Sequence, residues 1–144
     1  MVAFVLVTSG CQASEPLVPK EIYQQVNDDG REWTYDTAWQ NIRKLNADLD
    51  ASELSELSEQ ALFIASQMER LEKGKAGPLR DSSVVSIIER VAEETKSRST
   101  ELNLREAQGR ALRLQESFDA GDFLGAKEAA VEIHVITSRL NLVE

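Results

Sequence analysis

Two residue types that could carry side-chain chemistry occur only once each in this chain of 144 residues, as Cys11 and His134. A single cysteine cannot form a disulfide within the chain, so the chain has no internal disulfide framework. A single histidine falls short of the several nitrogen or sulfur donors that zinc sites use. The sequence therefore directs attention to the segment around Cys11 and to the helix that carries His134.

The residues before Cys11 form a short apolar segment that ends in small side chains. Residues 2–7 are all apolar, and Thr8-Ser9-Gly10 leads directly to the cysteine. Small side chains suit the narrow groove in which a signal peptidase holds the extended segment that it cuts. The segment resembles the lipobox of bacterial lipoproteins. That resemblance implies removal of residues 1–10 and attachment of a diacylglyceryl group to the Cys11 sulfur.

The resemblance also implies a location, and it shows two departures from the family pattern. With Gln12 after the cysteine, it implies a cell-envelope protein anchored by acyl chains such as palmitate in the outer membrane, facing the periplasm. Thr8 stands where lipoproteins usually have leucine, and the first basic residue is Lys20. Because signal peptides begin with a basic region, we expect the start codon to lie upstream, so that this sequence begins inside the signal peptide.

The composition describes an acidic, helix-rich globular chain. Hydrophobic residues make up 42% of it, and the net charge is −9 with a pI near 4.7. Such a surface repels polyanionic nucleic acid, so we expect no nucleic-acid partner. It also repels anionic lipid, so membrane attachment depends on the acyl chains, of which two or more anchor stably.

The chain divides into a tether and a helical domain. Residues 11–33 contain Pro16, Pro19 and the turn signal Asn27-Asp28-Asp29-Gly30, which favour an irregular connection. We expect a flexible tether over 11–33 and a bundle domain over 34–144.

Apolar residues at spacings of three and four predict the helices of that domain. The first is expected from the capping residue Asp36 to about residue 50, with an inward stripe of Trp39, Ile42, Leu45 and Leu49. A second is expected over 52–73, begun by a capping box of Asp50 and Glu53. A break near 48–52 is favoured, although one continuous helix is the alternative.

Later residues predict two more helices. Linker 74–79 precedes a long, bent helix over 82–120, for which two separate helices are the alternative. Asp122 is expected to cap the last helix, which carries a stripe through Ile133 and Leu140. The expected fold is all-α, an antiparallel up-and-down bundle of about four helices.

This plan resembles the architecture of cytochrome b562-like periplasmic bundles over residues 36–142. The resemblance implies a haem held by a methionine of the first helix and a histidine of the last. Here the only matching candidates are His134 and Met68, and Met68 lies on the second helix. A haem- or ligand-binding bundle is therefore the alternative function, and no cofactor is expected in the preferred one.

Three aromatic residues, Trp33, Tyr35 and Trp39, cluster at the start of the domain. They either close the end of the bundle or present a surface to a partner. With Trp39 facing inward, Trp33 and Tyr35 are the expected partner-binding residues.

No catalytic constellation is apparent, and we expect a non-enzymatic, lipid-anchored module that binds another envelope protein. An enzyme with unrecognised residues is the weakest alternative. It would need a deep polar cleft containing carboxylates with perturbed pKa values.

Overall fold

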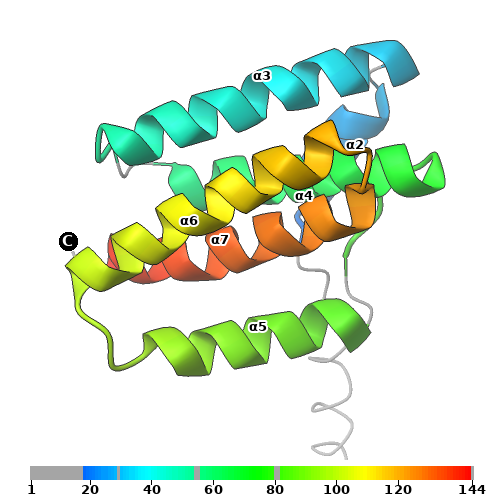
Figure 1. The fold of residues 1–144 in the computed structure, drawn as a ribbon. Coiled ribbons are helices and arrows are strands. Elements are labelled where there is room, and N and C mark those ends of the chain that lie inside the picture. The colour runs from blue at the N-terminus through cyan, green and yellow to red at the C-terminus, as the bar shows by residue number, and fades with distance from the viewer. Residues whose placement is uncertain (1–17, 29, 54–55, 80–81, 144) are drawn as a thin grey trace, which may run out of the picture.

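The computed structural model describes residues 18–28, 30–53, 56–79 and 82–143, and Cys11 with its lipobox-like segment lies outside them. The described residues contain helices and no strand, which confirms the all-α prediction. Within these ranges there are six helices rather than about four. They are α2 (Lys20–Asp28), α3 (Arg31–Asp50), α4 (Leu57–Lys73), α5 (Ser82–Thr95), α6 (Thr100–Asp119) and α7 (Phe123–Val143). Figure 1 shows how they are arranged.

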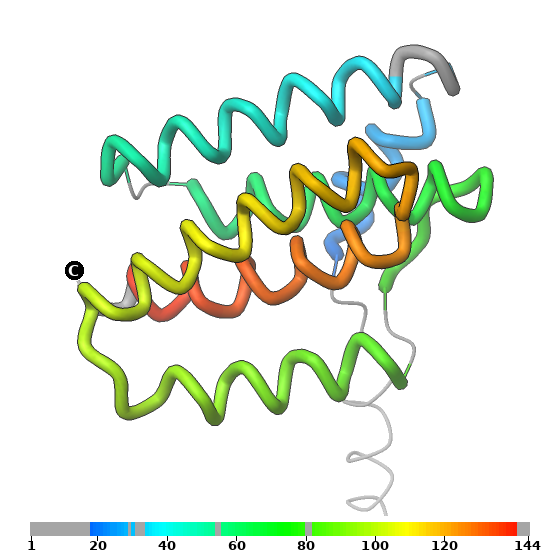
Figure 2. The backbone as a smooth tube through the Cα atoms, in the orientation of Figure 1, coloured from blue at the N-terminus to red at the C-terminus, as the bar shows by residue number. Residues whose placement is uncertain are grey.

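Successive helices from α3 to α7 run in alternating directions (Figure 2). Helices α3, α4, α7 and α6 form a closed ring in which each packs against its two neighbours. The α3–α4 pairing is antiparallel, because Asn41 bonds to Gln67 while Asp48, further along α3, bonds to Gln60, earlier in α4. Helix α5 lies outside the ring against α7, and α2 lies outside it against α4.

Helix α7 is the most deeply enclosed element. It packs against α4, α5 and α6. Its buried side chains therefore point in nearly every direction, as expected for a helix inside a core. The fully buried residues of the core include Ile42 and Leu45 from α3, Ile64 and Met68 from α4, Leu114 and Phe118 from α6, and Ile133 and Ile136 from α7.

The structure corrects the expectation of a flexible tether for residues 18–28. They form α2 and the segment leading into it, with Val18 and Val26 fully buried. The Val18 N–H donates to the Pro78 carbonyl at 3.2 Å, and Asn27 exchanges two hydrogen bonds with the backbone of Ala76. The apolar spacing of Ile22 and Val26 fits one helix face, which outweighs the turn signals on either side.

Helix α3 begins earlier than predicted and faces the core differently. Its N-cap is Gly30, and Asp36 is an exposed residue inside the helix rather than its cap. The inward stripe runs through Ala38, Ile42, Leu45 and Leu49, all fully buried. Because Ala38 takes the core position, Trp39 lies at the edge of the stripe, and its expected inward orientation is wrong.

Helices α3 and α4 are separate, and the break lies slightly later than predicted. Ser52 adopts a left-handed conformation with φ 58°, and the N–H groups of Ser52 and Glu53 donate to the carbonyls of Leu49 and Asp48. This is the Schellman pattern, which ends a helix. Helix α4 then starts at Leu57 after Glu56, without a side-chain cap, so the predicted capping box does not begin it.

The predicted long third helix is two helices. Residues 96–99 reverse the chain, and Ser99 caps α6 by accepting a hydrogen bond from the Leu102 N–H at 3.2 Å. Asn103 donates to the Thr95 carbonyl, which ties the end of α5 to the start of α6. The side chains of Ser99 and Asn103 thus satisfy backbone groups at the two helix ends. These hydrogen bonds favour a reversal of the chain over one continuous, bent helix. The last helix follows the prediction, since Asp122 accepts from the Gly125 N–H at 3.0 Å.

Candidate functional site

Three aromatic residues, Tyr35, Phe118 and Phe123, meet where the α6–α7 turn approaches α3. The ring of Tyr35 lies 4.8 Å from that of Phe118 and 6.5 Å from that of Phe123, between centroids. Phe118 is fully buried and Phe123 half-buried, and their centroids are 5.9 Å apart. Aromatic rings at such separations attract one another beyond the burial of their area. This contact anchors one side of Tyr35 in the bundle while leaving the rest of it outside.

The exposed aromatic residues of α3 form the surface that we call the aromatic face, made of Tyr35 and Trp39. Tyr35 is 43% exposed and Trp39 is 40% exposed. They are four residues apart and therefore lie on the same side of the helix. The Arg43 guanidinium carbon lies 4.7 Å from the Trp39 ring, within the range of a cation–π interaction. The face thus combines two large apolar rings with one positive charge.

Part of the aromatic face follows from the sequence pattern. Tyr35 was predicted as a surface residue, and it is exposed. Trp39 was assigned to the core and is the residue that reasoning missed. Trp33 lies within α3, but its side chain is outside the described part of the structure. The missed signal was Ala38, whose small side chain completes the inward stripe at a spacing of four from Ile42.

The structure does not bring Met68 and His134 together. The His134 ring is largely buried, with Nδ1 3.2 Å from the Ser58 carbonyl oxygen near the start of α4. Because a carbonyl accepts, Nδ1 carries the hydrogen. Burial lowers the pKa of His134, and the hydrogen bond to Ser58 opposes that shift only partly. Met68 lies ten residues further along α4, about 15 Å along the helix axis, fully buried in the core.

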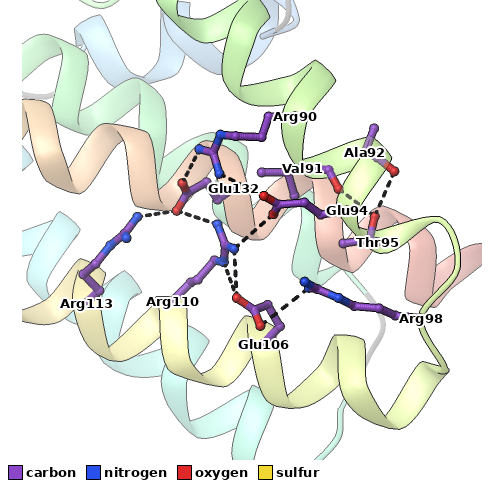
Figure 3. Close-up of polar contacts among 10 residues, drawn as sticks. All are labelled: Arg90, Val91, Ala92, Glu94, Thr95, Arg98, Glu106, Arg110, Arg113 and Glu132. Atoms are coloured by element: carbon purple, nitrogen blue, oxygen red, sulfur yellow. Dashed lines mark hydrogen bonds and ion pairs between the residues drawn. The ribbon is translucent and has the colours of Figure 1, made fainter.

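A polar cluster surrounds Glu132, a buried residue of α7 (Figure 3). Its carboxylate forms ion pairs with Arg90 of α5 and with Arg110 of α6, each with an N–O distance of 3.0 Å. Arg113 of α6 also bonds to it. The hydrogen bond to Glu132 and the charges of Glu132 and Glu94 raise the pKa of Arg90 above its ordinary value. One carboxylate therefore joins three helices.

Further ion pairs extend this cluster toward the α5–α6 turn. Arg110 also contacts Glu94 and Glu106, and Arg98 lies 3.6 Å from Glu106. Local sequence patterns do not predict this arrangement, because the arginines lie 19 to 42 residues from Glu132. The one local signal was a glutamate between the apolar residues Val131 and Ile133.

A buried ion pair joins α4 to α7 on another side of the core. Lys127 and Glu69, both largely buried, are 3.0 Å apart, and Lys73 approaches Glu69 at 3.2 Å. Among the described residues, no group of three or more histidine, cysteine or acidic side chains is arranged to hold a metal ion. None of the described helices is both long and apolar enough to cross a membrane.

The described residues therefore define an all-α bundle protein with an exposed aromatic face and a cluster of arginines around the buried Glu132. Comparison of the chain with protein-family models, with curated proteins and with solved structures gave no match.

Proposed function

We propose that this protein is a lipid-anchored, non-catalytic helical module that binds another protein of the cell envelope through its aromatic face. The observation that carries the binding proposal is the exposure of Tyr35 and Trp39 on one side of α3. The observation that carries the anchoring proposal is the lipobox-like segment ending at Cys11.

The aromatic face has the composition of a protein-binding hot spot. Tyrosine, tryptophan and arginine are the residues most often responsible for binding energy at interfaces. Tyr35 is held by Phe118 and Phe123, so little rotational freedom remains to be lost when a partner covers it. Arg43 adds a positive charge at the edge of the face. The partner that fits is an envelope protein that presents an apolar side chain next to a carboxylate.

The anchor supplies the location of this interaction. A diacylglyceryl group on Cys11 would hold the bundle at the outer membrane on the periplasmic side. Residues 11–17 would then separate the lipid from the helical body that starts at Val18. About seven extended residues span at most roughly 25 Å, so the partner would lie close to the membrane surface.

Fractionation of the native host tests the anchor. The complete gene, with any upstream coding sequence, is expressed as wild type and as Cys11→Ala, with and without globomycin. We expect the wild type in the membrane fraction, and an unprocessed precursor after the substitution or the antibiotic. Identical processing and a soluble product in all cases would refute the anchor.

Site-specific photo-crosslinking in the host tests the aromatic face. A photoreactive amino acid replaces Tyr35, Trp39 or, as the matched control, Gln40, which is exposed on another side of α3. We expect one crosslinked envelope protein from positions 35 and 39 and none from 40. A product of two copies of this chain, or equal crosslinking from position 40, would count against the proposal.

A further inference from the structure

The aromatic face borders the line along which α3 packs against α6. The ring of Tyr35, near the start of α3, contacts that of Phe118, near the end of α6. At the other end of the two helices, Gln108 Nε2 of α6 donates to the Leu49 carbonyl of α3 at 3.0 Å. The two helices therefore run antiparallel, and their contact extends for about 20 Å. We call this line of contact, with the exposed side chains on either side of it, the α3–α6 seam.

A third exposed apolar side chain, Leu112 of α6, lies at this seam. Leu112 is 62% exposed and lies four residues after Gln108, one turn further along the same side of α6. The carbonyl of the adjacent Ala111 accepts a hydrogen bond from Asn46 Nδ2 at 3.4 Å, which places this turn of α6 beside α3. On α3, Trp39 lies seven residues before Asn46 and therefore also on the side that faces α6. The exposed apolar residues of the seam are thus Tyr35, Trp39 and Leu112.

The solvent-exposed side of α3 carries three charges of alternating sign at equal spacing. Asp36, Arg43 and Asp50 are seven residues apart, and all three are exposed. Since seven residues are close to two helical turns, these charges lie in one row along α3. The Arg43 guanidinium lies over the Trp39 ring, so the row runs beside the aromatic face. None of the three charges forms an ion pair with another described residue.

An amphipathic helix is the partner that this pattern fits. Charges repeated every seven residues beside an apolar strip are the arrangement by which one helix selects another in paired helices. We infer that the α3–α6 seam binds an amphipathic helix of about four turns. Its apolar side covers the three exposed apolar residues of the seam. An acidic residue of that helix lies opposite Arg43, and basic residues seven positions before and after it lie opposite Asp36 and Asp50. This inference rests on the proposed function, since it names the kind of partner that the aromatic face binds.

The apolar and charged parts of the seam have different effects on binding. Tyr35, Trp39 and Leu112 lose contact with water when a helix covers them, so they supply most of the affinity. The three charges are exposed, and an exposed ion pair contributes little by itself. Their joint effect is selectivity, because a helix with the reverse order of charges meets three like-charge contacts. Affinity and selectivity are therefore separable in an experiment.

Nuclear magnetic resonance titration of the full chain with two synthetic helical peptides tests the selectivity. Both peptides carry the same leucine stripe, and at heptad spacing one has Lys, Glu and Lys where the other has Glu, Lys and Glu. We expect the first peptide to saturate the amide shifts of residues 35–50 and 108–118 with an affinity about tenfold above that of the second. Equal affinities, no saturation by either peptide, or shifts spread over the other helices would overturn the inference.

Two matched charge reversals locate the selectivity. Arg43→Glu should lower the preference for the first peptide from about tenfold to about twofold, because one of three charge contacts changes sign. Lys96→Glu makes the same change of charge at an exposed position of the turn between α5 and α6, away from the seam, and should leave the preference unchanged. An undiminished preference in Arg43→Glu would refute the assigned contact.

Photo-crosslinking in the host separates this inference from the proposed function. A photoreactive amino acid at Leu112 should capture the same envelope protein as one at Tyr35 or Trp39. The matched control is Leu102, which is 51% exposed on the same helix and lies about 15 Å before Leu112 along its axis. Capture from positions 35 and 39 but not from 112 would refute the seam and leave the proposed function standing. Absence of a product from positions 35 and 39 would instead refute the proposed function.

Discussion

The Glu132 carboxylate of α7 and the Arg110 guanidinium of α6 lie 3.0 Å apart, with the Glu132 side chain only 5% exposed and that of Arg110 14% exposed. Arg90 reaches the same carboxylate from α5. The outer helix α5 is therefore joined to the ring by an ion pair as well as by its apolar stripe of Val84, Ile87 and Val91.

Substitution Glu132→Gln should destabilise the fold strongly. It keeps the shape but removes the buried negative charge that Arg90, Arg110 and Arg113 share, which costs about 3 kcal/mol of unfolding free energy. Urea unfolding followed by circular dichroism measures this. The matched substitution Glu106→Gln, at a carboxylate that is about one-third exposed, should cost about 0.5 kcal/mol. Equal costs for the two variants would mean that Glu132 is not the centre of the network.

His134 should make stability depend on pH in a defined direction. Its pKa is lowered in the folded state, so the unfolded state binds the proton more readily. The contribution of neutral His134 to the unfolding free energy should therefore be complete above the ordinary histidine pKa of 6.5. It should be lost as the pH falls below that value toward the lowered pKa of the folded state.

The variant His134→Asn isolates this effect. Its amide can still donate to the Ser58 carbonyl but does not titrate. Urea unfolding at pH 7.5 and pH 5.5 should show a smaller loss of stability on acidification for the variant than for the wild type. An identical loss would assign the acid sensitivity to other groups.

Phe118→Ala should be among the most damaging single changes in the core. It removes a fully buried ring and also the contact that supports Tyr35, with an expected cost of about 3–5 kcal/mol. Leu112→Ala, at an exposed position of the same helix, should change stability by no more than about 0.5 kcal/mol. Chemical denaturation measures both, and a small effect of Phe118→Ala would contradict its place in the core.

Replacement by alanine should change stability in opposite directions at Gly109, within α6, and at Gly121, just after the end of that helix. Gly121 has φ +79°, where a side chain is strained, so Gly121→Ala should destabilise by about 1 kcal/mol. Gly109 lies exposed within α6, with nothing within 4 Å of an added Cβ. Gly109→Ala should therefore stabilise by about 0.5–1 kcal/mol. Thermal unfolding compares the two, and the same sign for both would contradict this assignment.

Local patterns predicted the helical class and several boundaries, because these depend on residues close together in sequence. Asp122 and Gly121 between two apolar stripes indicated the last turn correctly. The helix predicted over 52–73 was also found, as α4 over Leu57–Lys73. Such features need only spacing and capping chemistry to be recognised.

Features that depend on distant contacts were not predictable in the same way. Helix α2 is short and lies among turn signals, and it is held in place by contacts near Ala76 and Pro78, about 50 residues later. Trp39 and Ala38 are adjacent, and only packing against α4 and α6 decides which of them faces inward. The Glu132 cluster needs three helices to meet before its arginines have a common partner.

The alternating directions of the helices have a consequence for how the chain could be divided. Two hairpins, α3–α4 and α6–α7, meet face to face across the core, and α5 is the return path between them. Cleavage of the backbone at the exposed Lys75 would break the covalent connection between these halves. Their shared apolar surfaces would remain intact. Two fragments made separately should therefore reassemble when mixed. In that sense the molecule behaves like a heterodimer of two helical hairpins that are joined in one polypeptide.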